Sequence, residues 1–394
     1  MRRDGLSGKI ARSITLAEDM SPALFRPLAL RDLQLSNRVV VAPMCQYSAV
    51  DGSATDWHLM HLGSMTQSGA ALTLIEATGV SPEGRITPAC LGLWSDENEA
   101  ALDRVLKAIR PHAKGAIGIQ LAHAGRKASS APPFQGGQLI PPQDGGWTPW
   151  APSAVPQKAG EAAPHEMSEA DIQAVVVQFG KAAERAHRLG LDAAEVHAAH
   201  GYLLHQFLSP LSNRRTDAWG GSLANRMRLP LAVFDAVRAA WPAGKPVGVR
   251  VSATDWMEHA GVPSWTLDQT VELAKALKAR GCDFIDVSSG GLTAQQQIPL
   301  GAGYQVPFAR AVREATGLPT MAVGLITEAA QAEQILVDGD ADMVALARGM
   351  LWNPRWVWHA AAALGAQVVP PAQYGRAAPR AHAQALTGVP FGGR

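Results

Sequence analysis

The chain has 394 residues, 47% of them hydrophobic and 18% charged, and 35 basic residues nearly balance 34 acidic ones. A chain of this composition can bury a large core, but it lacks the uninterrupted run of roughly 20 apolar residues that a membrane-spanning helix needs. The formal net charge of +1 creates no field that would attract nucleic acid or an acidic membrane surface.

The N-terminal residues are basic but lack the apolar stretch of a secretory signal. Asp4 and the Glu18–Asp19 pair argue against an amphipathic transit peptide, so residues 1–20 are expected to form a flexible extension. Three cysteines in the whole chain are too few for a disulfide framework or an iron–sulfur cluster. This cysteine usage favours a reducing, cytoplasmic location.

From residue 39 onward, short apolar runs alternate with longer segments of helical period, which is the pattern of βα units around a parallel sheet. The predicted strands are 39–43, 72–79, 116–123, 193–200, 246–252, 283–290, 319–326 and 343–349. The predicted helices include 98–110, 168–189, 223–240, 266–280 and 327–338. Eight strands, each followed by a helical stretch, predict a (β/α)8 TIM barrel. We expect the barrel to occupy residues 21–376 and to be followed by a tail at 377–394.

One segment after the third strand, at about 131–165, interrupts this alternation. It is rich in proline and glycine and carries Trp147 and Trp150. A segment of this length without a helical pattern is either a functional lid or disordered. The tryptophans favour a lid, and we expect it to contain a hairpin near 147–153. Ser168 and Asp171 then provide a capping signal for the helix that follows.

Active sites of such barrels lie at the C-terminal ends of the strands. The residues at these ends that could carry chemistry are Pro43, Met44, Cys45, Gln46, Tyr47, Glu76, Ala77, Gln120, His123, His197, His200, Tyr202, Arg250, Ala347 and Arg348. Any one of these side chains could merely satisfy loop backbone, but their occurrence on six strands favours one shared pocket.

His197 and His200 are three residues apart, and no Glu or Cys nearby has the spacing of a third zinc ligand, so no metal site is predicted. The pair is either a satisfied pair of core histidines or, as we favour, two hydrogen-bond donors to a carbonyl oxygen. Tyr202, a phenol with an ordinary pKa of about 10, can supply a proton, although a packed aromatic side chain is the alternative.

Several of these motifs resemble the Old Yellow Enzyme family of FMN-dependent ene-reductases, and the resemblance covers about 21–376. The matching runs are V-A-P-M-C-Q-Y-S at 41–48, G-I-Q-L-A-H-A-G-R-K-A at 118–128, H-A-A-H-G-Y at 197–202 and A-R-G-M-L at 347–351. The Cys45–Tyr47 pair resembles the thermophilic-like bacterial branch of that family.

The resemblance implies an FMN site whose residues are Ala42, Pro43, Met44, Cys45, Ala77, Gln120, Arg250, Gly324, Ala347 and Arg348. Gln120 and Arg250 would hydrogen-bond the pyrimidine edge of the flavin, where a cation stabilises the charge of the reduced ring. Arg348 would hold the phosphate with charge-assisted hydrogen bonds. Cys45 would lie against the flavin, or else be a small buried hydrophobe.

The implied reaction takes hydride from NADPH through flavin N5 to the β-carbon of an α,β-unsaturated ketone or aldehyde. In that reaction Tyr202 protonates the α-carbon, and His197, His200, Tyr47 and Arg376 bind the substrate. The alternatives are an FMN barrel oxidoreductase with another acceptor and a non-catalytic flavin-binding protein.

In the resembling branch, the arginine that matches Arg376 reaches into a neighbouring subunit, which implies a homodimer or a tetramer built from dimers. This chain departs from the pattern because it continues to Arg394. Trp352, Trp356 and Trp358 are expected to pack in the core or in such an interface.

Overall fold

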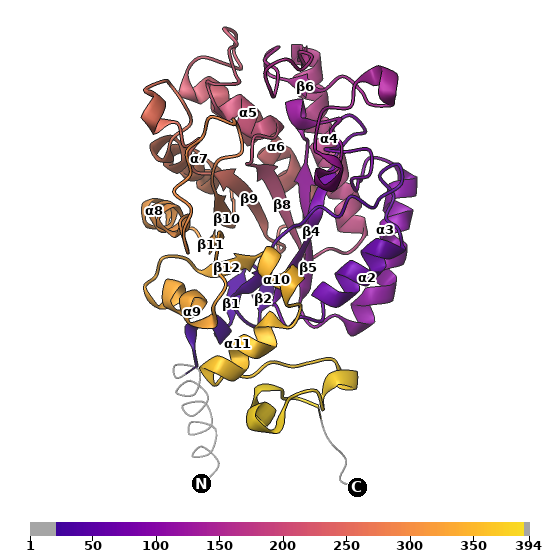
Figure 1. The fold of residues 1–394 in the computed structure, drawn as a ribbon, viewed down its shortest axis with the longest axis vertical. Helices are drawn as coiled ribbons and strands as arrows, with labels where there is room; N and C mark the ends of the chain where they lie inside the picture. Colours follow the sequence, from indigo (N-terminus) through magenta and orange to yellow (C-terminus); the bar gives the residue numbers. More distant parts are fainter. Residues whose placement is uncertain (1–20, 390–394) are drawn as a thin grey trace, which may run out of the picture.

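The computed structural model describes residues 21–389, so the predicted extension at 1–20 and the end of the predicted tail at 390–394 lie outside the described residues. Eight parallel strands close into a barrel in the order β3, β4, β5, β8, β9, β10, β11 and β12 (Figure 1). Their bounds are β3 Val39–Val41, β4 Leu72–Gly79, β5 Ala116–Ala122, β8 Ala193–Ala198, β9 Val247–Ser252, β10 Phe284–Ser288, β11 Thr320–Ala322 and β12 Met343–Leu346. Each predicted strand run contains one of these strands, and the predicted TIM barrel is confirmed.

Helices surround the strands (Figure 1). Those that the sequence pattern predicts are α3 Asp96–Ile109, α4 Glu169–Arg188, α6 Leu223–Ala240, α7 Leu267–Ala279 and α9 Ala329–Val337. Segments with a weaker signal form α2 Asp56–Met65, α5 Leu203–Leu208, α8 Val306–Thr316, α10 Arg348–Trp352 and α11 Trp356–Leu364. The capping signal before α4 is confirmed, because Ser168 Oγ accepts from Asp171 N and an Asp171 carboxylate oxygen accepts from Ser168 N at 2.8 Å.

The N-terminal end of the barrel is closed by a hairpin of β1 Leu28–Leu30 and β2 Leu33–Leu35. Leu30 and Leu35 of the hairpin belong to an apolar cluster with strand residues such as Phe284, which is fully buried. Gly248 leaves the space for that ring, since a Cβ at Gly248 would lie 2.1 Å from it. This end of the interior is therefore apolar, and the polar side chains of the strands gather toward the other end.

The segment predicted to be a lid lies outside the barrel and forms no hairpin near 147–153. Instead, β6 Trp150–Ala151 pairs in parallel with β7 His165–Glu166, over two residues only. Prolines at 149 and 152 flank β6, and because proline has no N–H to donate, the ladder does not extend. Trp147 Nε1 donates to the backbone oxygen of Glu83 at 2.9 Å, which anchors the segment to the loop after β4.

Two predicted strands end early where their segments turn into the site. The strand predicted at 319–326 stops at Ala322, because Gly324 and Leu325 have φ values of 113° and 51°. The strand predicted at 343–349 stops at Leu346, and α10 begins at Arg348.

Candidate active site

The two histidines at the end of β8 face each other. Their ring centres are 5.1 Å apart, and His197 Nε2 lies 3.4 Å from His200 Nδ1. The backbone N–H of Ala199 donates to His197 Nδ1 at 3.3 Å, so the proton of His197 resides on Nε2 and points toward His200. Burial lowers the pKa of both imidazoles well below the ordinary value. Both rings are therefore neutral hydrogen-bond donors at neutral pH.

His200 has a left-handed backbone, with φ of 56°. Such a conformation is costly for a residue with a Cβ and persists where neighbouring groups impose it. Here the N–H of His200 donates to Ser252 Oγ at 2.9 Å, and its carbonyl oxygen accepts from Lys127 Nζ at 2.7 Å. Lys127 also donates to the carbonyl oxygen of Gly291, which ties the loops after β8 and β10 together.

Ser288, at the end of β10, contacts the ring of His200. Its Oγ lies 2.7 Å from His200 Nε2 and donates to Gln305 Oε1 at 3.3 Å. If the hydroxyl turned to donate to Nε2 instead, the proton of His200 would reside on Nδ1, and both imidazoles would then present an N–H to the same point. Ser288 is absent from the residues predicted above. The only sequence signal for it is a polar S-S-G run directly after an apolar strand.

Tyr202 lies beside this pair. Its ring centre is 4.9 Å from that of His197, at an interplanar angle of 80°. Burial raises the pKa of the Tyr202 phenol well above its ordinary value, and the nearby Cys45 and Tyr47 raise it further. The phenol therefore keeps its proton at neutral pH. Cys45 and Tyr47 both belong to the loop after β3.

Tyr47 joins this loop to the predicted lid. It has a left-handed φ of 50°, and its ring lies edge-on to Phe134 of the 131–165 segment with 6.1 Å between ring centres. Glu76 holds the same loop, because its carboxylate accepts from Gln46 N at 3.0 Å and lies 3.3 Å from His58 Nε2. Glu76 thus supports the loop rather than facing the histidine pair.

A layer of buried polar and charged side chains crosses the barrel beside His197. Gln120 Nε2 donates to Glu195 Oε1 at 2.8 Å, and Arg250 Nε lies 3.2 Å from Asp286 Oδ2. Arg250 pairs in register with His197 on one side and with Asp286 on the other. Burial raises the pKa of Glu195 to about 8, and the adjacent Asp286 carboxylate adds to the shift. Glu195 is therefore mostly protonated at neutral pH, while Asp286 balances the charge of Arg250.

Glu195 and Asp286 are absent from the predicted site residues. Each is the one acidic residue in its strand, and all residues of both strands are buried. An acidic residue within an apolar strand is rare unless it is paired, so this signal was available in the sequence.

A β-bulge brings Ala77 into the site. The register of β4 and β5 shifts between Ile75 and Ala77, so that Ala77 pairs with Gln120. Bulges of this kind occur next to active sites because they redirect side chains. The other neighbour of β4 is β3, which also pairs with β12. The backbone N–H of Ala42 donates to the carbonyl oxygen of Leu346 at 3.0 Å, and this bond extends the pairing of β3 with β12 toward Pro43 and Met44.

The ends of β11 and β12 enclose a small cavity of about 120 Å³, lined by 323–327 and 345–349. Gly324, Ala347 and Arg348 all line it. A Cβ at Gly324 would lie 2.5 Å from Gln305 Nε2, and the φ of 113° strains any residue that has a side chain. A concave backbone cradle with one arginine suits a phosphate group. The residues present therefore fit the phosphate of the predicted flavin, and Gln120 and Arg250 fit its pyrimidine edge.

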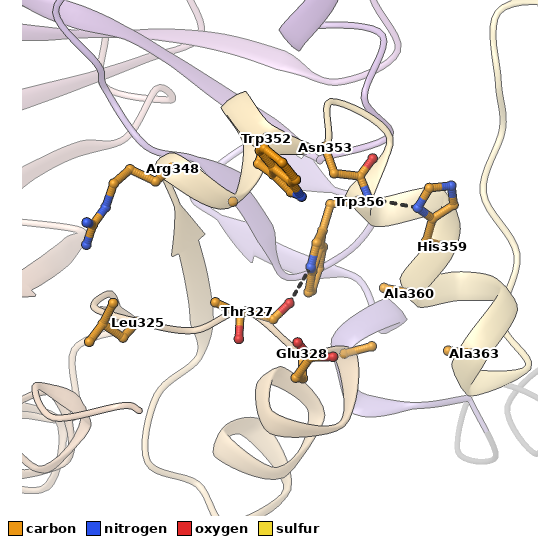
Figure 2. Close-up of a pocket in the computed structure, with 12 residues that line it drawn as sticks. Leu325, Thr327, Glu328, Arg348, Trp352, Asn353, Trp356, His359, Ala360 and Ala363 are labelled. Atoms are coloured by element: carbon orange, nitrogen blue, oxygen red, sulfur yellow. Dashed lines mark hydrogen bonds between the residues drawn. The ribbon is translucent and has the colours of Figure 1, made fainter. Parts of the chain in front are cut away.

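A larger cavity of about 730 Å³ adjoins this cradle on its outer side, between α9, α10 and α11 (Figure 2). Trp352 and Trp356 project into it, and Trp356 Nε1 donates to the Thr327 carbonyl oxygen at 2.7 Å. Figure 2 shows the guanidinium of Arg348 pointing away from this cavity. Neither His197 nor His200 lines this cavity. Trp352 is 92% exposed, whereas Trp356 and Trp358 are buried.

Arg376 lies away from the histidine pair of its own chain. Tyr374, two residues before Arg376, packs against the α11 region: its ring centre lies 6.2 Å from that of Trp358 and 5.5 Å from the guanidinium carbon of Arg355. Arg376 itself is exposed, and the residues that follow fold back so that Val368 pairs with Leu386.

Within residues 21–389, no group of three or more His, Cys, Asp and Glu side chains is arranged to hold a metal ion. Over the same residues, none of the helices combines the length and apolar character needed to cross a bilayer.

The family model of the NADH:flavin oxidoreductase / NADH oxidase family matches residues 23–367. The NADPH dehydrogenase of Geobacillus thermodenitrificans is 44% identical over 359 residues, covering 91% of this chain and 99% of the relative. That of Listeria innocua is 44% identical over 356 residues, covering 90% and 98%. Morphinone reductase in complex with tetrahydroNAD superimposes with a TM-score of 0.70 at 28% identity, covering 94% and 95%.

Proposed function

The chain belongs to the NADH:flavin oxidoreductase / NADH oxidase family, and we propose that within this family it reduces α,β-unsaturated ketones and aldehydes. It is an oxidoreductase with FMN as cofactor and NADPH as hydride donor. The observation that carries the proposed substrate class is the pair of neutral imidazoles with a protonated phenol against one of them.

FMN, when bound, would supply the transfer of hydride from NADPH to the β-carbon of the substrate. The protein would orient the flavin and place positive charge beside its ring and its phosphate. Gln120, which has both a donor and an acceptor, would pair with the amide-like edge of the ring. Arg250 would stabilise the negative charge of the reduced ring from the same side. Gly324 and Arg348 would hold the phosphate.

The imidazoles polarise the substrate. His197 Nε2–H and His200 Nδ1–H would donate to one carbonyl oxygen, which draws electron density from the conjugated double bond. Because both groups are fixed before the substrate arrives, they stabilise the developing enolate oxygen at little reorganisation cost. Tyr202 would then protonate the α-carbon, and its raised pKa keeps the proton available until the enolate forms.

Anaerobic spectroscopy tests this proposal. The purified protein should be yellow, bleach with NADPH, and regain its colour when cyclohexenone is added. Replacing both histidines with alanine should leave FMN binding and bleaching intact but abolish the recovery of colour. Recovery in the double variant would refute the assigned role. Bleaching of the wild type without recovery would favour another acceptor, and a colourless protein that takes up no flavin would refute the flavin site.

We also propose that the chain assembles through the surface around α10, so that Arg376 of one subunit reaches a neighbouring site. Leu351 and Trp352 of α10 are 49% and 92% exposed, and Met60 of α2 is 62% exposed. Exposed apolar side chains on neighbouring elements are typical of subunit interfaces. Trp352→Glu should lower the mass measured by light scattering to that of one chain, and an unchanged mass would contradict this interface.

The three cysteines are free thiols, which suits a reducing compartment, and we place the enzyme in the cytoplasm. Detection of the native protein in a secreted or periplasmic fraction would contradict this placement.

A further inference from the structure

Gln305, at the start of α8, joins two parts of the candidate site. Its side chain is buried, and its Nε2 donates to the carbonyl oxygen of Val323 at 2.9 Å. Val323 follows β11 and lines the phosphate cradle. On the other side, Gln305 Oε1 accepts from the hydroxyls of Ser288 at 3.3 Å and Ser289 at 2.6 Å, where β10 ends. One amide therefore connects the phosphate cradle to the serine that contacts His200.

The neighbours of Gln305 fix the direction of its amide. The Val323 carbonyl oxygen can only accept, so the amide nitrogen faces Val323 and the amide oxygen faces the two serines. Trp256 Nε1 donates to Ser289 Oγ at 2.9 Å, which leaves the Ser289 hydroxyl hydrogen for Gln305. Turning the amide over would place donors against donors and acceptors against acceptors. The end of Gln305 that faces Ser288 is therefore an acceptor.

A run of hydrogen bonds with one direction links the histidine pair to this acceptor. His197 holds its proton on Nε2, which lies 3.4 Å from His200 Nδ1. When Nδ1 accepts, the His200 proton resides on Nε2, which lies 2.7 Å from Ser288 Oγ. The Ser288 hydroxyl in turn donates to Gln305 Oε1. Each donor in this run thus meets an acceptor, and the Gln305 oxygen is the last of them.

The run can also exist in the opposite direction. A carbonyl oxygen held between the imidazoles needs an N–H at Nδ1 of His200, and Nε2 then accepts from Ser288. The Ser288 hydroxyl has to leave Gln305 for this, so that Oε1 keeps only the bond from Ser289. Both forms of the half-buried His200 ring carry one proton, because one proton arrives at Nδ1 from water as one leaves Nε2. The two directions therefore compete for a single hydroxyl hydrogen.

We propose that Gln305 is a positioning residue that holds the free enzyme in the first direction, and that a bound carbonyl compound reverses it. The Gln305 oxygen thereby opposes carbonyl binding, and the bond from Nε2 to Val323 ties its orientation to the phosphate cradle. The inference rests on the proposed carbonyl-binding role of the histidines. The resting position of the His200 proton, however, can be measured without any substrate.

The test determines the tautomer of His200 by NMR in the FMN-loaded, oxidised protein, labelled isotopically at the ring nitrogens of its histidines. The chemical shift of each ring nitrogen shows whether it carries the proton, and the spectrum of His200→Asn assigns the signals of His200. In the free protein the proton should reside on Nε2. Cyclohexanone, a saturated ketone without the double bond that is reduced, should move it to Nδ1.

Two variants of Gln305 separate its acceptor from its bulk. Gln305→Met removes the acceptor and keeps the length of the side chain. In the free protein it should shift the ratio of the two tautomers toward Nδ1–H by about two- to tenfold, the effect of one neutral hydrogen bond. Gln305→Glu retains an oxygen toward the serines and should keep the proton on Nε2.

Gln331→Met is the matched control. Gln331 Nε2 also donates to the loop after β11, to the Leu325 carbonyl oxygen at 3.2 Å, but its amide oxygen accepts from Thr327 N instead of from the serines. This variant should therefore perturb the same loop and leave the proton of His200 on Nε2.

A proton on Nδ1 of His200 in the free wild type would overturn the proposal, and so would an equal tautomer ratio in Gln305→Met and the wild type. A proton that stays on Nε2 with cyclohexanone bound, as followed by flavin absorbance, would overturn the reversal. The wild-type spectra decide two of these points even if a variant folds poorly. Failure of the proposed enone reduction is distinguishable, because the bleached flavin then does not regain its colour with cyclohexenone, whatever the position of the His200 proton.

Discussion

The protonated state of Glu195 gives the sharpest prediction from the structure. The side chain is fully buried, and burial raises its pKa from 4.5 to about 8 in the folded chain. Between those values, the unfolded chain loses the proton while the folded chain keeps it, so this group stabilises the fold at low pH and its contribution is lost as pH rises toward 8. The slope is about 1.4 kcal/mol per pH unit, which amounts to about 4 kcal/mol between pH 5 and pH 8.

Glu195→Gln removes this titration while preserving the hydrogen bond, because a glutamine oxygen can also accept from Gln120 Nε2. The measurement is the urea unfolding midpoint of FMN-saturated wild type and variant from pH 5 to pH 8. The stability advantage of the wild type over the variant should shrink steadily with rising pH, because groups that do not interact with Glu195 titrate alike in both proteins and cancel in the difference. Glu314→Gln, at an exposed position on α8, should keep the pH dependence of the wild type.

Parallel curves for wild type and Glu195→Gln would refute the reasoning. They would mean that Glu195 is ionised in the folded protein, with Arg250 shared between two carboxylates instead of being balanced by Asp286 alone.

The remaining predictions concern the reaction and the groups around it. Tyr202→Phe should slow enone reduction by about 10²-fold or more, the usual contribution of a general acid, while leaving flavin reduction by NADPH unchanged in stopped-flow absorbance; equal slowing of both steps would contradict its role as proton donor. Ser288→Ala should raise KM for cyclohexenone about five- to tenfold, since it removes the hydroxyl that would donate to His200 Nε2 and hold the His200 proton on Nδ1 when the substrate is bound; steady-state kinetics will contradict this if KM stays the same. Asp286→Asn should shift the flavin reduction potential in the positive direction, measured by equilibration with a reference dye, because Arg250 loses its balancing charge; a negative shift would show that Asp286 does not act through Arg250.

The sequence alone determined the architecture of this protein. Eight apolar runs, separated by segments of helical period, predict the barrel because a strand covered on both faces needs an apolar side chain at nearly every position. The same rhythm places His197, His200 and Tyr202 at a strand end, where barrels of this kind carry their sites. Short signals such as Ser168 with Asp171 also predict structure reliably, because their hydrogen bonds are local.

Only the tertiary structure decided which groups meet across the barrel. Glu195 acquires its raised pKa from burial and from Asp286, which lies 91 positions further along the chain on another strand. The choice of tautomer at His200 depends on Ser288, which is 88 residues away in sequence. The lid segment forms a two-residue parallel pair because of where its prolines fall against β7. Such partners are set by strand register and loop packing, which link positions far apart in the chain and leave no periodic trace in the sequence.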